Sequence, residues 1–155
     1  MWKNLYDSLL QILAGPWAKY LSENGAQGRL VRDNFFNSIY PYSGLILIGI
    51  TLVATLLFYF YFNNRFGKYY KVRTWFLWML FSSLIIGICT FVLSKTFLSS
   101  FMCPTNLLII WQSLINLFYG LILFFILSLV FQAVSIVIRK LFHIDLSSMG
   151  SRTPF

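Results

Sequence analysis

The stretch SGLILIGITLVATLLFYFYF, from Ser43 to Phe62, is twenty residues long and contains no charged residue. A helix of that length rises about 30 Å, which matches the thickness of the hydrocarbon core of a bilayer. The stretch from Thr74 to Ser94 (TWFLWMLFSSLIIGICTFVLS) is a second uncharged apolar segment, of twenty-one residues. Two such segments in one short chain predict an integral membrane protein.

A third uncharged stretch runs for thirty-three residues, from Asn106 to Ile138. As a single helix it would be about 50 Å long and would overshoot the bilayer. Two spans joined by a hairpin need about forty residues and a polar turn, and the sequence at Gly120 supplies only a weak turn signal. We therefore expect one long helix that tilts or projects past the membrane, with a break near Gly120 as the alternative.

The composition of the whole chain agrees with this interpretation. Of its 155 residues, 59% are hydrophobic and 10% are charged, whereas soluble domains average roughly 45–50% and 25%. A net charge of +8 would favour nucleic-acid binding in a soluble protein, but beside this apolar excess it indicates a membrane instead, and no nucleic acid is expected as a partner. Because 20% of the residues are aromatic, many of these side chains must face lipid or partner proteins.

Residues 1–42 differ from the rest because they hold seven of the sixteen charged residues and no window long enough to span a membrane. On a helical wheel the first residues separate into two faces. The apolar face holds Trp2, Leu5, Tyr6, Leu9, Leu10, Ile12 and Leu13, and the polar face holds Lys3, Asn4, Asp7 and Gln11. We expect an amphipathic helix, lying on a membrane surface or packed on a partner, that ends at Gly15 and Pro16. After it we expect a short helix over 17–24, a turn over 25–28 and an aromatic approach to the first span over 34–42.

The predicted fold is thus an all-α integral membrane protein with three transmembrane helices preceded by an amphipathic interfacial N-terminal helical region. Its parts are the N-terminal region 1–42, a transmembrane helical domain 43–142 with spans at about 43–62, 74–94 and 106–138, and a polar C-terminal tail 143–155.

The distribution of Lys and Arg predicts how the chain is oriented. Four basic residues and no acid lie between the first two spans, and we call them the basic loop: Arg65, Lys68, Lys71 and Arg73. Three more basic residues follow the third span, and near the span ends on the opposite side there are only three, Arg29, Arg32 and Lys95. The basic loop and the C-terminus are therefore expected on the inner side of a bacterial or organellar inner membrane. Aromatic residues between these charges favour anchoring to anionic lipids, with recognition of an acidic partner or a nucleotide as the alternative.

Small and hydroxyl residues recur at helical spacing in two of the spans. In lipid this spacing lets helix backbones approach closely, which replaces the hydrophobic drive that water provides. We expect two helix-packing seams, within one chain or between copies, although small residues are also common in membrane helices generally. The seams comprise Gly44, Thr51 and Thr55 in the first span, and Ser83, Gly87, Thr90 and Ser94 in the second.

The third span carries two polar clusters on nearly opposite faces: Gln112 with Asn116, and farther along Ser128, Gln132 and Ser135. Amides in hydrocarbon need hydrogen-bonding partners, so this helix is expected to contact two different neighbours. The alternatives are that the first cluster is simply hydrated and that the second lines a water-filled pore.

The sequence contains few residues that could support catalysis. All four acids lie outside the spans, and His143 is the only histidine. Cys89 and Cys103 have neither metal-ligand spacing nor a neighbouring base. We therefore expect no catalytic, cofactor or metal site and no enzyme activity.

These features predict a non-catalytic structural or anchoring subunit of a multi-subunit membrane complex, with lipid and other membrane subunits as its partners. The alternative is a self-assembling membrane effector whose copies associate through the second-span seam and form a pore or disrupt the bilayer.

Overall fold

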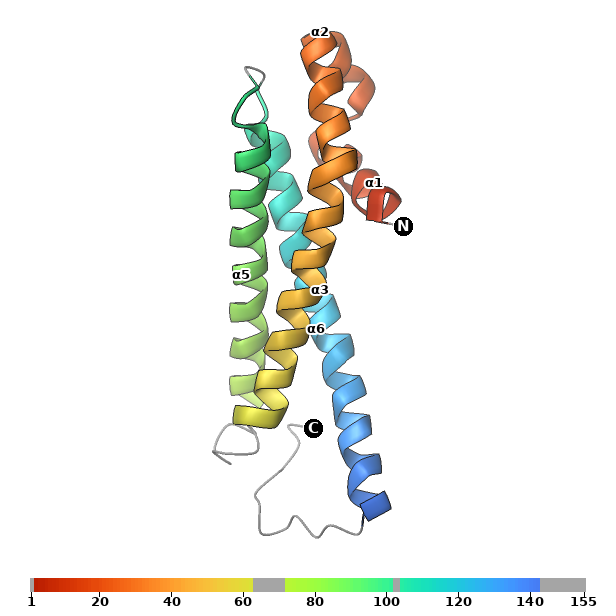
Figure 1. Ribbon diagram of the computed structural model, residues 1–155, viewed down its shortest axis with the longest axis vertical. Coiled ribbons are helices and arrows are strands. Elements are labelled where there is room, and N and C mark those ends of the chain that lie inside the picture. Colours follow the sequence, from red (N-terminus) through yellow and green to blue (C-terminus); the bar gives the residue numbers. More distant parts are fainter. Residues whose placement is uncertain (1, 63–71, 102–103, 143–155) are drawn as a thin grey trace.

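A computed structural model describes residues 2–62, 72–101 and 104–142, and the side chains of residues 4–59, 72–101 and 104–132. Every element in these ranges is helical (Figure 1). In chain order the elements are α1 (Trp2–Ala14), α2 (Trp17–Asn34), the π-helix η1 (Phe35–Ile39), α3 (Tyr40–Leu56), the π-helix η2 (Leu57–Phe62), α5 (Val72–Leu98) and α6 (Asn106–Phe142).

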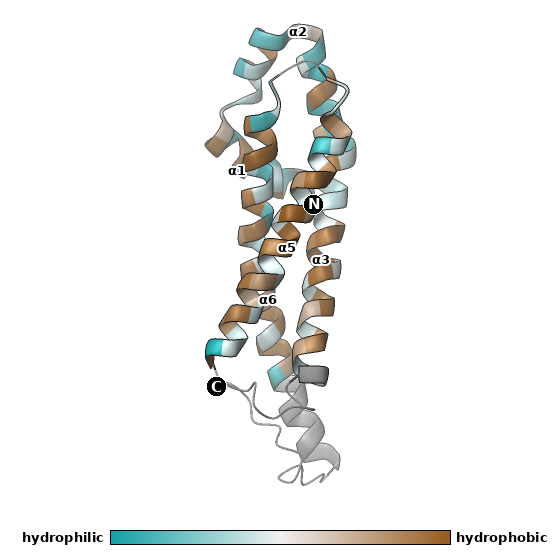
Figure 2. Ribbon diagram, turned by 90° about the vertical axis from the view of Figure 1, so that its left-hand side faces the viewer, coloured by the Kyte–Doolittle hydropathy of each residue, from teal (hydrophilic) through white to brown (hydrophobic). Residues whose placement is uncertain are grey.

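Three helical segments are long and apolar enough to cross a membrane: Trp17–Tyr59, Val72–Leu98 and Asn106–Gln132. This finding confirms the predicted all-helical fold with three helices long and apolar enough to span a membrane, and it is compatible with a multi-pass membrane protein. Figure 1 shows α3 running antiparallel to α5, and α5 antiparallel to α6. Hydrophobic residues cover α3, α5 and α6, whereas hydrophilic residues gather around α2 (Figure 2).

The N-terminal region departs from the sequence prediction after residue 24. Gly25 is non-helical, with φ 55° and ψ −129°, and forms a kink between two helical parts of α2, the second of which continues through η1 into α3. The expected end of the short helix at Gly25 is thus present as a kink, residues 26–28 of the expected turn are helical, and the aromatic approach over 34–42 is helical and continuous with the first span. Packing explains the extended helix, because Phe35, Ile39 and Tyr40 are fully buried in the main core. The wider π-helical turns come just before Pro41, a residue that cannot donate the usual helical hydrogen bond.

Helix α6 is one continuous helix of 37 residues, about 55 Å long at 1.5 Å per residue. It has no break at Gly120. A Cβ atom at this glycine would lie 3.0 Å from Ile86 Cδ1 and 3.4 Å from Ser83 Oγ. Gly120 therefore allows α5 to approach α6 closely instead of forming a turn.

Two apolar clusters hold the bundle together. The larger one joins α1, α2 and η1 to the adjoining ends of α3, α5 and α6, and it includes Tyr6, Trp17, Phe35 and Tyr40. The smaller one lies nearer the other end of the bundle and consists of Ala54, Phe58, Trp75, Met79 and Phe124. Helix α1 packs against α6 and α3, so the N-terminal helix is part of the folded bundle.

Candidate functional site

The side chain of Asn116 lies at a junction of four helices. Its Oδ1 accepts a hydrogen bond from Tyr6 Oη of α1 at 2.5 Å. Its Nδ2 donates to the backbone oxygen of Ser43 in α3 at 3.2 Å and to Thr90 Oγ1 of α5 at 2.5 Å. Thr90 in turn donates to the backbone oxygen of Ile86 at 2.8 Å. We call Tyr6, Ser43, Thr90 and Asn116 the polar junction, because together they link α1 to all three spanning helices.

Tyr6 is held in the junction by aromatic rings as well as by its hydroxyl. Its ring stacks on Tyr40 with centroids 5.7 Å apart, and it meets the edge of Tyr119 at 5.5 Å. Tyr119 Oη also donates to the backbone oxygen of Leu5 at 3.1 Å. Burial, with a smaller contribution from Tyr119, raises the pKa of the Tyr6 phenol above its ordinary value. Tyr6 is therefore a neutral hydrogen-bond donor at physiological pH.

A second set of polar contacts, around Asp7, holds α1 against the start of α2. Asp7 accepts hydrogen bonds from Trp17 Nε1 at 2.7 Å and from Gln11 Nε2 at 2.6 Å, and Tyr40 Oη approaches the same carboxylate at 3.5 Å. Gly15, with φ 99°, makes the turn that brings Trp17 within reach of Asp7. Asp7 was expected on the polar face of an amphipathic helix, and in the structure it links α1, α2 and α3.

One turn from Asn116, next to the polar junction, lies a buried polar side chain without a hydrogen-bond partner among the described residues. Gln112 is fully buried, and neither atom of its amide has a hydrogen-bond partner in the described part of the chain. The hydroxyls of Ser43 and Ser94 are likewise buried without a partner among the described residues. Ser94 lies one turn from Thr90, on the same side as Gln112 relative to Asn116, because α5 and α6 run antiparallel. Gln112 and Ser94 therefore lie next to the hydrogen-bonded amide of Asn116 without partners of their own among the described residues. Buried polar groups without partners lower the stability of a fold.

The predicted seam of the second span lies between α5 and α6 of the same chain. Ser83, Gly87, Thr90 and Ser94 are all buried. A Cβ atom on Gly87 would lie 3.3 Å from the Leu117 side chain, so this glycine sets the distance between the two helices. The seam is filled within the chain, and association between copies would need another surface.

The residues of the first-span seam are also buried. Gly44, Thr51 and Thr55 all face into the bundle. Thr51 Oγ1 donates to the backbone oxygen of Leu47 at 2.5 Å, and Thr55 Oγ1 to that of Thr51 at 2.6 Å. Their hydroxyls are therefore satisfied inside their own helix, and their small size permits close packing.

The second polar cluster of α6 has a different environment from the one we expected. Ser128 is buried and accepts a hydrogen bond from Trp75 Nε1 of α5 at 3.1 Å, and Phe124 also packs beside Trp75. Gln132 is half-buried, and the side chain of Ser135 lies outside the described residues. Helix α6 contacts more than one neighbour, as expected, but both Asn116 and Ser128 bond to α5, and Asn116 bonds also to α1 and α3. The antiparallel course of the two helices explains this, since α5 follows α6 past both positions.

The remaining candidates lie mostly outside the described residues. These are Arg65, Lys68 and Lys71 of the basic loop, together with Cys103 and His143. Arg73 is exposed in the first turn of α5, and Cys89 is partly buried and unpaired. Among the described residues, no three His, Cys, Asp or Glu side chains gather in a way that would hold a metal ion.

Sequence reasoning missed the place of Tyr6 in the polar junction and the contact of Asp7 with Trp17. A signal for Asp7 was present, because it is the only carboxylate before Glu23 and lies close to Trp17 in the sequence. Tyr6 gave no such signal, because a tyrosine on an apolar helix face is equally consistent with lipid contact. Comparisons with protein-family models, curated proteins and solved structures found no match to this chain.

Proposed function

We propose that this protein is a non-catalytic anchoring subunit of a membrane complex, and that it holds helices α1 and α2 in a fixed position at one membrane surface. The observation that carries the proposal is the polar junction, because Asn116 ties α1 to α3, α5 and α6 through buried hydrogen bonds. An N-terminal helix bound in this way is a rigid part of the bundle.

The position of the junction relative to the membrane follows from the charges on α5. Arg73 and Lys95 are exposed and stand twenty-two positions apart, which corresponds to about 33 Å along the helix and matches the hydrocarbon thickness. Thr90 lies five positions inside Lys95, about 7.5 Å below that boundary. Helix α1 would then lie at the interface, with the exposed side chains of Leu5, Ile12 and Leu13 toward lipid.

Helix α2 would form the partner-facing part of the molecule. Its exposed side chains include both signs of charge, as at Lys19, Glu23, Arg29 and Asp33. A mixed polar surface of this kind, held beyond the membrane boundary by α1 and α3, suits contact with a polar partner surface. The alternative function, a self-assembling effector, is less well supported because α6 already covers the second-span seam.

Purification of the tagged full-length chain from its native membrane in mild detergent tests the proposal. We expect other membrane subunits in constant stoichiometry. Asn116→Leu should weaken their retention by releasing α1, whereas Gln112→Leu, one turn away, should retain them. Homo-oligomers alone, with no other subunit in constant ratio, would contradict the proposal.

A further inference from the structure

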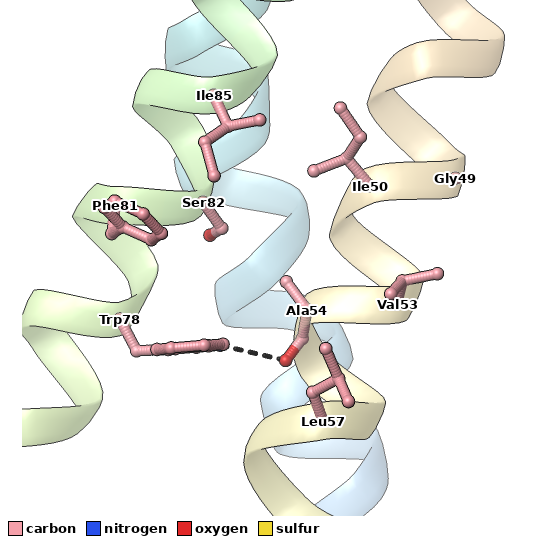
Figure 3. A pocket seen from close by; sticks show the side chains of 9 residues that line it. All are labelled: Gly49, Ile50, Val53, Ala54, Leu57, Trp78, Phe81, Ser82 and Ile85. Atoms are coloured by element: carbon pink, nitrogen blue, oxygen red, sulfur yellow. Dashed lines mark hydrogen bonds between the residues drawn. The ribbon is translucent and has the colours of Figure 1, made fainter.

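The lipid-facing side of α5 carries two apolar grooves. The first lies between α3 and α5, has a volume of about 390 Å³ and is lined by residues that include Gly49, Val53, Trp78, Phe81 and Ile85 (Figure 3). Trp78 Nε1 closes its floor by donating to the backbone oxygen of Ala54 at 2.9 Å. Ser82 in its wall donates to the backbone oxygen of Met79 at 2.9 Å. Both polar groups therefore already have hydrogen-bond acceptors within the fold, and the groove presents an apolar surface to a ligand.

The second groove lies on the other side of Trp78 and Phe81. It is shallow and open, has a volume of about 610 Å³ and is lined by residues of α5 alone, from Thr74 to Leu84. Trp78 and Phe81 line both grooves, and their ring centroids are 6.1 Å apart. The two rings thus form a ridge with one apolar groove on each side.

A positive charge stands at the end of the second groove. Arg73 is exposed and lies four and seven positions before Leu77 and Leu80, so it shares the helix face that these leucines give to the groove. Within the described residues no ion pair engages Arg73. An anion at this guanidinium would have apolar grooves leading from it toward the membrane centre.

We infer that this surface binds one anionic phospholipid, with its phosphate at Arg73 and its two acyl chains on either side of the Trp78–Phe81 ridge. Two grooves that share a ridge and begin near a cation match a two-chain anionic lipid in both shape and charge. A helix of a second copy packed along the same face is the competing occupant, and it would exclude the lipid. The inference depends on the chain being in a membrane and not on the proposed partner subunits.

Native mass spectrometry of the full-length chain tests this site. The protein is equilibrated in detergent with equimolar phosphatidylglycerol and phosphatidylcholine, and the retained lipids are counted. We expect the phosphatidylglycerol adduct to exceed the phosphatidylcholine adduct about fivefold, which corresponds to about 1 kcal/mol for one basic residue at a lipid phosphate. Arg73→Gln should remove this preference, and Lys95→Gln, at the other end of the same helix, should preserve it.

A second variant tests the acyl-chain grooves. Because a Cβ atom at Gly49 would meet nothing within 4 Å, Gly49→Leu should fill the first groove without disturbing the fold, and the retention of both lipids should fall. The inference is overturned if the unaltered protein shows no preference or if Arg73→Gln retains it. It is also overturned if Lys95→Gln loses as much preference as Arg73→Gln, or if lipid-free dimers form instead.

Discussion

Two neighbouring amides on α6 should respond oppositely to the same substitution. Asn116 and Gln112 are one turn apart and both fully buried, but Asn116 makes three hydrogen bonds and Gln112 has no partner among the described residues. Replacing either by Leu removes one buried amide, so the desolvation cost that is relieved is similar in the two variants. The difference between the variants is therefore the value of the bonds to Asn116.

The magnitude follows from the structure. Hydrogen bonds between membrane helices average about 0.6 kcal/mol, so the three bonds of Asn116 are worth about 2 kcal/mol. Asn116→Leu also removes the acceptor of the buried Tyr6 hydroxyl, which costs about 1–3 kcal/mol more. We expect Asn116→Leu to be about 3–5 kcal/mol less stable than Gln112→Leu. Gln112→Leu itself should equal or exceed the stability of the unaltered protein.

Unfolding by SDS titration from mild detergent micelles, followed by circular dichroism and tryptophan fluorescence, measures this difference. The Trp17 environment should change first in Asn116→Leu, since α1 detaches when the bond to Tyr6 is lost. Equal destabilisation by the two substitutions, or a larger loss for Gln112→Leu, would refute the assignment of Asn116 as the centre of the junction.

Two further predictions concern packing and topology. Gly87→Leu should separate α5 from α6 and lower the stability of the fold, because the new side chain would collide with Leu117. Gly49→Leu, which enters open space, is the matched control. Equal thermal stability of the two variants would show that the close contact at Gly87 is unimportant. Lys68→Cys and Ser99→Cys should react with an impermeant thiol reagent from opposite sides of sealed vesicles, and labelling of both from one side would exclude three spans.

The spanning helices could be predicted from the sequence because each one depends on a local property, a run of apolar residues as long as the bilayer is thick. The polar junction could not be predicted in the same way. Tyr6 and Asn116 are separated by 110 positions. The periodicity of α1 and α6 does not indicate that these two side chains form a hydrogen bond. The kink at Gly25 follows its local turn signal. The helical course of the chain from there to the first span does not, since a local signal does not reveal that Phe35 and Tyr40 are buried by distant helices.

Gln112 shows a second limit of prediction from helical periodicity. The sequence places Gln112 and Asn116 on one face, and both are buried there. Whether each amide has a partner depends on Tyr6, Ser43 and Thr90, which belong to three other helices. Helical spacing predicted the face but not the hydrogen bonds.

The most direct test of the account is whether α1 is docked on α6 in the membrane. The photoreactive residue p-benzoylphenylalanine, incorporated in place of Tyr119, would lie where the Tyr119 hydroxyl contacts the backbone of Leu5. After irradiation in native vesicles and digestion, mass spectrometry should find position 119 joined to the α1 peptide of the same chain. Crosslinks only to lipid or to other proteins, with none to α1, would contradict the account.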